Sequence, residues 1–494
     1  MHLAFPSLGW WPMAAVGIAM LWYSIEHATI RVAFGYGMLS GLAFFLPHLW
    51  WAYTSVGWIP WLALSLLQSV AFGLVAAAWA YVRSREILGS AVGLEPLLFG
   101  LIWVSAEQLR SYVPFGGFPW GRLAFSQADA FTGRLAWLGG APLVSFAVAV
   151  TGAALALGFE AARAKRVLLS AGAVFAGAIV TVIGIVIPLD TQAESGVLNV
   201  VVVQGNAPNK GLDAFVQARL VTNNHAEVTH EVAAADLPEY DLVIWPENSA
   251  DIDPRVDHPT FEIITGAAQA VGVPILIGAI DRTPEEGRLN TSILWSPDGE
   301  ALDTYSKQHP APFAEYIPMR DFARLFSDEV DRVTLDMIAG EGPATIDLDS
   351  PRLGRTVVLG DIICFEVAYD SIVRDSISNG GEVLIVQTNN ASFGITSESK
   401  QQLAMTRIRA IETGRATIQS STVGVSGVVS PDGTLLQSTG LFEPAWMYAE
   451  VPLRTSKTPA MVIGYPLEML FLFGPLALFA IRIGRGLRGR WDWD

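Results

Sequence analysis

Cysteine is almost absent from this chain, because Cys364 is the only one among 494 residues. A single cysteine excludes an intrachain disulfide framework and any metal site built from several cysteines. A basic excess is lacking too: 31 Lys and Arg face 47 Asp and Glu, and the net charge is −16. Nucleic acids bind positively charged surfaces, so this balance argues against a nucleic-acid partner. No pattern in the sequence suggests a metal or an organic cofactor.

Acidic residues are scarce over residues 1–188 and 457–490, whereas the stretch between them holds most of the Asp and Glu. The whole chain is 51% hydrophobic with a mean hydropathy of +0.40, which is too apolar for a soluble protein. Two physical classes of domain therefore share the chain. We expect N-terminal transmembrane helices over residues 1–188, a polar domain over 189–456, and a C-terminal transmembrane helix with a basic tail over 457–494.

Seven apolar runs are each near the length of about 20 residues that crosses a bilayer as a helix. They are expected near residues 8–25, 32–54, 58–82, 88–109, 134–159, 166–188 and 459–481. Several tryptophans fall near their ends, where indole rings prefer the membrane interface. A cleaved signal peptide does not fit, because the apolar runs continue and the flanking charges are wrong.

The Lys and Arg residues of the short connections indicate the orientation. If the seven spans alternate, Arg31, Arg83, Arg85, the 163–166 cluster and the arginines of the 482–490 tail all fall on one side. That side is predicted to be the cytoplasm. The acidic region 189–456 then lies outside, on the same face as the loop 110–133.

Within the acidic region, apolar runs typical of buried strands alternate with helical segments, which indicates an α/β class. Strands are expected at 198–204, 241–247, 273–279, 289–295, 301–305, 355–364 and 382–387. Helices are expected near 213–235, 260–271, 367–378 and 398–413. A closing hairpin is expected around the turn Ser430-Pro-Asp-Gly433.

Glu247, Lys307 and Cys364 each sit at or near the end of an expected strand, the edge where open α/β sheets collect their chemistry. A lone cysteine usually fills space in a core. A catalytic thiol, in contrast, needs a base or a nearby cation, because its ordinary pKa is about 8.5. Glu247 supplies a base, and Lys307 supplies a cation for the thiolate and for an oxyanion.

These residues carry a resemblance to a known superfamily. The segments Trp245-Pro-Glu247, Lys307 with 312–318, and Ile363-Cys364-Phe-Glu366 resemble the carbon-nitrogen hydrolase (nitrilase) superfamily. Joined to the membrane part, they are similar to the apolipoprotein N-acyltransferase family. The likeness extends to Phe118-Pro-Trp-Gly121 and Gln204-Gly-Asn206.

The resemblance implies a polytopic α-helical membrane domain plus an extracytoplasmic α/β nitrilase-like domain, an αββα sandwich. It implies that Glu247 is the general base, Lys307 the oxyanion stabiliser and Cys364 the nucleophile. It also implies that Glu315 positions the lysine and that Glu366 supports the cysteine. Alternatively, Glu315 is a solvated loop acid, and Glu366 is a helix N-terminal acid favoured by the dipole, a role that is compatible with support of the cysteine.

The implied reaction is a ping-pong acyl transfer in the bacterial cytoplasmic (inner) membrane. A membrane phospholipid donates an acyl chain to Cys364 as a thioester, and the N-terminal amine of a diacylated apolipoprotein accepts it. Phe118 and Trp120 are expected to contact lipid in the outer loop, although simple aromatic anchoring at the interface is an equal alternative.

Other functions remain open at this stage. A membrane-anchored carbon-nitrogen amidase would use the same triad with water as the acceptor. A transporter or scaffold with an inactive domain is a different class, but transporters tend to show internal repeats and ionisable residues within several spans. The chain also departs from the family pattern at Ala314, Phe365 and Ser392, where Gly, Tyr and Trp are usual. None of these departures touches the triad.

Overall fold

The computed structural model describes residues 1–491 except 208–217, 283–286, 327–329 and 332. The chain forms two compact units, each built from separate segments. The helical unit comprises Met1–His48, Leu62–Ile187 and Val462–Asp494, and the sandwich unit comprises Leu49–Trp61 and Pro188–Met461. The N-terminal sequence is thus divided, because a short piece of it belongs with the sandwich unit.

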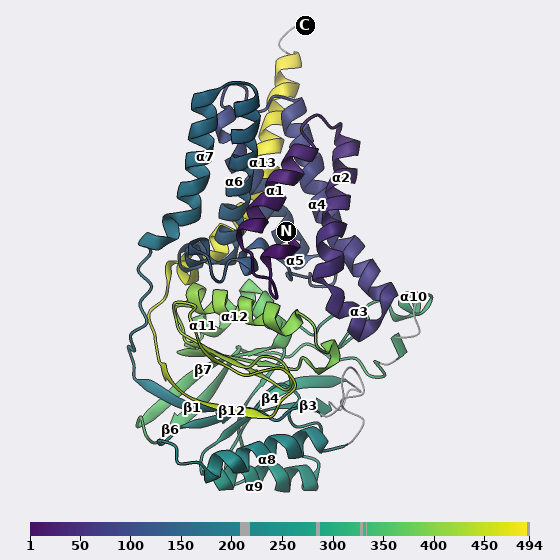
Figure 1. Cartoon of the computed structure of the whole chain (residues 1–494). Coiled ribbons are helices and arrows are strands. Elements are labelled where there is room, and N and C mark those ends of the chain that lie inside the picture. Colours follow the sequence, from purple (N-terminus) through teal and green to yellow (C-terminus); the bar gives the residue numbers. More distant parts are fainter. Residues whose placement is uncertain (208–217, 283–286, 327–329, 332, 492–494) are drawn as a thin grey trace. The chain divides into compact units, whose positions relative to one another are not determined.

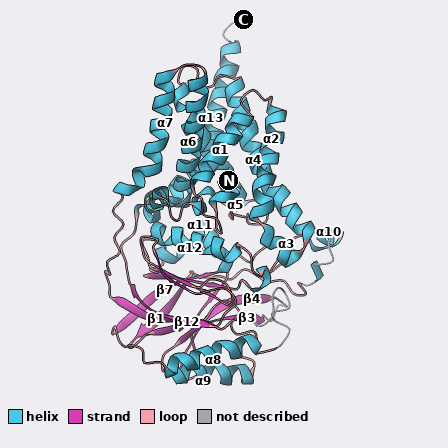
Figure 2. Cartoon of the chain, in the orientation of Figure 1, coloured by secondary structure: helices cyan, strands magenta, loops and turns pink. Residues whose placement is uncertain are grey.

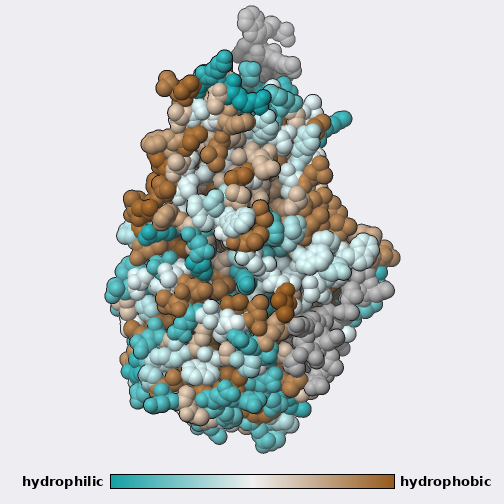
Figure 3. All heavy atoms as spheres, viewed as in Figure 1, coloured by the Kyte–Doolittle hydropathy of each residue, from teal (hydrophilic) through white to brown (hydrophobic). Residues whose placement is uncertain are grey.

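The helical unit consists of long apolar helices (Figure 1). They are α1 (Pro12–Ser24), α2 (Ile30–His48), α4 (Trp58–Ser84), α5 (Glu95–Tyr112), α6 (Ala136–Arg163), α7 (Val167–Val182) and α13 (Pro459–Trp491). Short 3-10 turns precede or follow them: η1 (His2–Ala4), η2 (Val92–Leu94), η3 (Leu123–Ser126), η4 (Phe131–Leu135) and η5 (Ile183–Val186). Apolar side chains gather on the exposed face of this unit (Figure 3), as lipid contact requires.

Among the described residues, six helical segments are long and apolar enough to cross a membrane: 30–48, 58–84, 92–112, 131–163, 167–186 and 459–477. The expected span at 8–25 is wrong in length, because α1 has only 13 residues. The expected span at 32–54 is also wrong, because α2 ends at His48 and a separate helix, α3 (Trp50–Val56), follows. Pro47 lies in the last turn of α2, and Leu49 leaves the helical region with ψ 21°.

Helix α6 is the centre of the helical unit, with 78% of its most apolar window buried. It packs against α1, α5 and α7. Small residues permit these close approaches: a Cβ on Gly152 would stand 2.5 Å from the carbonyl oxygen of Ala15. Close approach through small residues is a common way for helices to associate in lipid.

The sandwich unit contains two six-stranded sheets, which confirms the expected α/β class. The first has the order β12-β1-β2-β3-β4-β5 and the second β11-β10-β9-β8-β7-β6. The first sheet comprises β1 (Val197–Gln204), β2 (Leu242–Ile244), β3 (Ile275–Arg282), β4 (Arg288–Trp295), β5 (Ala301–Ser306) and β12 (Ala445–Pro452). The second comprises β6 (Thr345–Ser350), β7 (Arg355–Ile363), β8 (Val383–Thr388), β9 (Thr417–Ser421), β10 (Gly427–Val429) and β11 (Leu435–Ser438).

The central strands are parallel: β1, β2 and β3 in the first sheet, and β7, β8 and β9 in the second. Their side chains are buried, as the continuous apolar runs predict for strands covered on both faces. Parallel pairing places the carboxyl ends of β7 and β8 side by side, with Ile363 opposite Gln387. Cys364 and Asn389, the residues just beyond, are thereby brought to one edge.

Helices cover the outer faces of both sheets (Figures 1 and 2). Helices α8 (Leu220–Ala234) and α9 (His258–Val271) lie on the first sheet, and α11 (Asp370–Ser378) and α12 (Glu398–Thr413) lie on the second. The helix expected from 213 begins at Leu220 in the structure, and 213–217 lie outside the described residues. The unit also contains the short helices α3 and α10 (Arg320–Arg324) and the 3-10 turns η8 (Cys364–Ala368) and η9 (Ala391–Phe393).

Candidate active site

Cys364 stands at the junction between strand β7 and the 3-10 turn η8. Its backbone has a φ of +54°, a conformation that costs energy for a residue with a Cβ. The turn leaves Cys364 partly exposed although the strand before it is buried. Such a reversal at a strand end presents a side chain for chemistry, which supports the interpretation of Cys364 as a nucleophile.

Glu247 follows strand β2 and is 4% exposed. Its Oε1 accepts hydrogen bonds from Asn290 Nδ2 at 2.7 Å and from Lys307 Nζ at 3.3 Å. Its Oε2 accepts the backbone N–H of Asn389 at 2.7 Å. A buried carboxylate that receives donors on both oxygens is held in one orientation, as a general base requires.

Lys307 follows strand β5, and its side chain is 2% exposed. The ammonium lies between two carboxylates, at 3.3 Å from Glu247 Oε1 and 2.9 Å from Glu315 Oε1. Burial lowers the pKa of Lys307, but the charges of Glu247 and Glu315 outweigh it and raise this pKa well above its ordinary value. The site therefore contains a permanent cation.

Glu315 is bound into this arrangement and is not a freely solvated loop acid. Its Oε1 accepts from Lys307 and from Asn290 Nδ2 at 3.0 Å, and its Oε2 accepts the backbone N–H of Ala311 at 2.6 Å. Asn290 thus bridges the two carboxylates that flank the lysine.

The Cys364 thiol is influenced by the charges of Glu247 and Lys307. Burial and the negative charge of Glu247 raise the pKa of the thiol, and Lys307 lowers it. The net effect is a raised pKa, so the thiol is protonated at neutral pH. A base must remove its proton when it reacts, and Glu247 is the buried carboxylate that acts on it most strongly.

Glu366 is completely buried behind the cysteine turn. Its Oε1 accepts the backbone N–H groups of Gln308 and His309 at 2.7 and 3.1 Å. Its Oε2 accepts the N–H of Ile363 at 2.9 Å, and both oxygens are 3.0 Å from the Tyr305 hydroxyl. Burial raises the pKa of Glu366 against the opposing effects of Lys307 and these N–H groups. One carboxyl therefore ties the chain after Lys307 to the chain before Cys364.

The sequence did not single out four polar residues that contact the triad: Asn290, Thr388, Asn389 and Gln402. The polar run Gln387-Thr-Asn-Asn390, which ends the apolar strand β8 and continues beyond it, was a usable signal. Asn290 and Gln402 gave no such signal in the sequence. They lie within a strand and a helix, and only the fold determines which of their side chains face the site.

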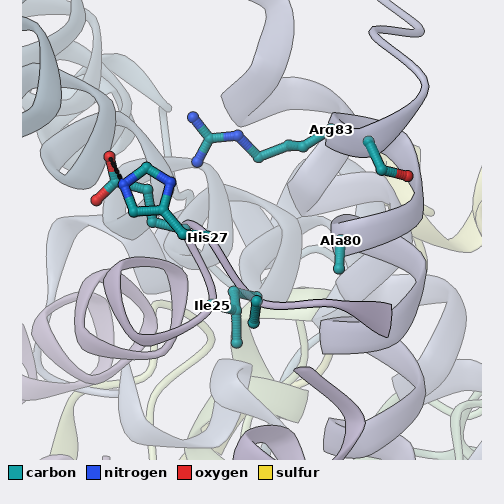
Figure 4. Close-up of a pocket in the computed structure, with 7 residues that line it drawn as sticks. Ile25, His27, Ala80 and Arg83 are labelled. Carbon is teal, nitrogen blue, oxygen red and sulfur yellow. Dashed lines mark ion pairs between the residues drawn. The ribbon is translucent and has the colours of Figure 1, made fainter. Parts of the chain in front are cut away.

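Phe118 and Trp120 lie in the helical unit, where Trp120 is 2% exposed and its carbonyl oxygen accepts from Arg110 at 2.8 Å. A pocket in the same unit is lined by seven residues that include Ile25, His27 and Arg83 (Figure 4). None of the seven belongs to the triad. Among the described residues, no group of three or more His, Cys, Asp or Glu side chains is arranged to hold a metal ion.

Comparison with known proteins gives a consistent result. Residues 1–154 match the family model of the apolipoprotein N-acyltransferase N-terminal domain, and residues 218–458 match that of carbon-nitrogen hydrolases. An apolipoprotein N-acyltransferase of Mycolicibacterium smegmatis is 36% identical, with 97% of this chain and 83% of the relative covered. One of Azotobacter vinelandii is 28% identical, with 93% and 88% covered.

A solved amidase of the nitrilase superfamily from Nesterenkonia aligns with 55% of this chain and 96% of its own, at 16% identity and a TM-score of 0.40. The family assignment rests on the sequence relatives, which span both parts of the chain. Since they cover the helical part and the strands that carry Glu247, Lys307 and Cys364 alike, the chain belongs to the apolipoprotein N-acyltransferase family.

Proposed function

We propose that this chain transfers an acyl chain from a membrane phospholipid to the N-terminal amine of a diacylated apolipoprotein, with Cys364 as nucleophile, Glu247 as general base and Lys307 as oxyanion stabiliser. The observation that carries these roles is the buried array of Lys307 between Glu247 and Glu315, next to a partly exposed cysteine on a strained turn. The relatives that share both parts of the chain are acyltransferases by name, which supports transfer to an amine.

In the first half-reaction, Glu247 takes the thiol proton of Cys364, and the thiolate attacks the ester carbonyl of the phospholipid. Negative charge develops on the carbonyl oxygen, and the Lys307 ammonium stabilises it. The carbon–oxygen bond of the ester breaks, Glu247 returns the proton to the departing lysophospholipid hydroxyl, and the acyl group remains on sulfur as a thioester.

In the second half-reaction, the α-amine of the acceptor attacks the thioester carbonyl. Glu247 accepts a proton from the nitrogen, and the carbon–sulfur bond breaks. The amide product is released, and Cys364 remains as a thiolate. The proton held by Glu247 then returns to sulfur. Glu315 and Glu366 are positioning residues, since Glu315 holds the lysine and Glu366 ties the two loops together.

We further propose that the enzyme lies in the bacterial inner membrane with its sandwich unit on the extracytoplasmic side. The distribution of Lys and Arg over the short connections supports this orientation. Attachment to the bilayer suits two lipid-anchored substrates, because confinement to one surface raises their effective concentration.

Intact-protein mass spectrometry of the detergent-purified enzyme with phospholipid tests the reaction. We expect wild type to gain the mass of one acyl chain and Cys364→Ala to gain none. A diacylated lipopeptide should discharge the adduct and appear as its N-acylated product. Glu315→Gln, which keeps the side-chain size, should form the adduct about 10-fold more slowly, because the lysine loses one of its two charged partners.

Two outcomes would contradict the proposal. An adduct that discharges equally fast without the lipopeptide indicates a hydrolase, in which water is the acceptor. An adduct that also forms on Cys364→Ala shows that Cys364 is not the residue that carries the acyl chain.

A further inference from the structure

A second set of polar side chains meets the Cys364 sulfur and has no part in the mechanism above. Thr388 Oγ1 lies 3.4 Å from Cys364 Sγ, and Gln402 Nε2 lies 3.7 Å from it. Thr388 is the last residue of β8 and Gln402 lies on α12, and both are completely buried. Buried polar side chains of this kind are normally held by hydrogen bonds, and these two have several.

The orientation of the Gln402 amide follows from its neighbours. Gln402 Oε1 accepts from Asn390 Nδ2 at 2.9 Å, so the NH2 group of Gln402 is the part that faces the sulfur. Asn390 is oriented in turn: its Nδ2 also donates to Glu398 Oε2 at 2.7 Å, and its Oδ1 accepts from Ser421 Oγ at 2.6 Å. This chain of hydrogen bonds begins at a backbone group, because the N–H of Gly424 donates to Ser421 Oγ at 2.8 Å.

The Thr388 hydroxyl has two acceptors within reach. It lies 2.8 Å from Gln402 Oε1 and 3.4 Å from Cys364 Sγ, and Asn390 Nδ2 is 3.3 Å from it. A hydroxyl has one proton. Rotation of this proton from Gln402 to the sulfur requires no movement of a heavy atom, so the second donor is available when charge develops on sulfur.

A thiolate at Cys364 needs such hydrogen-bond donors to stabilise its negative charge. Lys307 is shared between two carboxylates, and Glu247 places a negative charge near the sulfur. Glu398, the other acid near it, has its pKa raised to about 8 by burial, against the effect of the Asn390 hydrogen bond. It is therefore mostly protonated at neutral pH and adds little negative charge.

We propose that Thr388 and Gln402 are further catalytic residues, which donate hydrogen bonds to the Cys364 thiolate and are oriented for this by Asn390. The inference rests on the proposed role of Cys364 as the nucleophile. The thiolate attacks in the first half-reaction and leaves in the second, so the same donors lower the barrier of both steps.

Alkylation by iodoacetamide tests the inference without any lipid, and it reports Cys364 alone because the chain has no other cysteine. The rate is measured from pH 6 to 10. We expect Thr388→Val, which keeps the shape of the side chain, to lower the rate at pH 7 about 10-fold and to move the profile to higher pH by about one unit. Gln402→Leu should shift it in the same direction, and Thr388→Ser should restore the wild-type profile because it restores the hydroxyl.

Thr413→Val is the matched control. Thr413 is a buried threonine of α12 whose hydroxyl donates to the carbonyl oxygen of Arg409, away from the sulfur. The inference is overturned if Thr388→Val keeps the wild-type profile, or if Thr413→Val shifts it equally. The proposed function has its own test, and it is wrong if wild type forms no acyl adduct. In that case a shifted alkylation profile would still support the two donors.

Discussion

At the scale of single residues, the sequence predicted that the three proposed catalytic residues follow strands, and two of them, Glu247 and Cys364, follow apolar runs. Glu247, Lys307 and Cys364 follow β2, β5 and β7, as expected. The polar residues around them were not predictable in the same way. Asn290 joins Glu247 to Glu315 only because β4 pairs with β5 in one particular register.

Asp361 is a buried carboxyl of β7 that the mechanism does not use. Burial raises its pKa to about 7. Between about pH 4, where the unfolded chain releases this proton, and about pH 7, where the folded protein does, the unfolded state binds fewer protons. Stability therefore falls as the pH rises through this window.

We expect Asp361→Asn to remove this loss of stability at higher pH. The melting temperature of the variant in detergent should exceed that of wild type by several degrees at pH 8, and by clearly less at pH 5. Asp349→Asn, at an exposed position of the neighbouring strand β6, should show no such dependence. An equal shift of Asp361→Asn at both pH values would contradict the assignment.

At the scale of elements, the length and continuity of the apolar and helical patterns decided which elements the sequence predicted. The buried parallel strands and α12 were predictable from continuous apolar or helical patterns. Strands β6 and β12 were not expected, although the alternation of apolar and acidic residues in β6 is itself a strand pattern. Strand β12 depends on antiparallel pairing with the distant β1. The break between α2 and α3 was hidden because both sides of it are apolar and aromatic.

Helix α12 is tied to the cysteine turn by Arg409, which is completely buried. Its guanidinium donates to the carbonyl oxygens of Val367 and Ala368 at 2.8 and 2.9 Å and forms ion pairs with Asp370 and Glu412. Loss of one partner of a buried ion pair costs more than the pair contributes, since the remaining charges stay buried.

Arg409→Met should therefore lower the stability of the sandwich unit by about 3 to 5 kcal/mol, measured by urea unfolding followed by intrinsic fluorescence. Arg407→Met removes the half-buried neighbour on the same helix, whose Nε donates to the carbonyl oxygen of Gly433, and it should cost about 1 kcal/mol. Similar losses in the two variants would show that Arg409 does not hold α12 in place.

At the scale of the whole molecule, the Lys and Arg residues of the short connections predict the orientation in the membrane. The single cysteine makes it measurable. Cys364 should react with a membrane-impermeant maleimide in intact spheroplasts, before lysis, if the sandwich unit faces outward. Cys364→Ala should not react.

A second position provides the opposite control. Arg85→Cys in the Cys364→Ala background places a thiol in an exposed connection that is predicted to be cytoplasmic. This thiol should react only after lysis. Labelling of Arg85→Cys in intact spheroplasts, together with no labelling of Cys364 in intact wild-type spheroplasts, would reverse the proposed orientation.

The division of the chain into units limits how the enzyme can be shortened. Segment Leu49–Trp61 belongs to the sandwich unit although it precedes most of the membrane helices in sequence. There the Trp51 ring packs against Phe393 in η9, five residues after Thr388, with ring centroids 5.0 Å apart. A soluble fragment that starts at Pro188 would omit this tryptophan and expose the loop beside the nucleophile, so proteolytic trimming or domain expression at that boundary does not yield a complete catalytic unit.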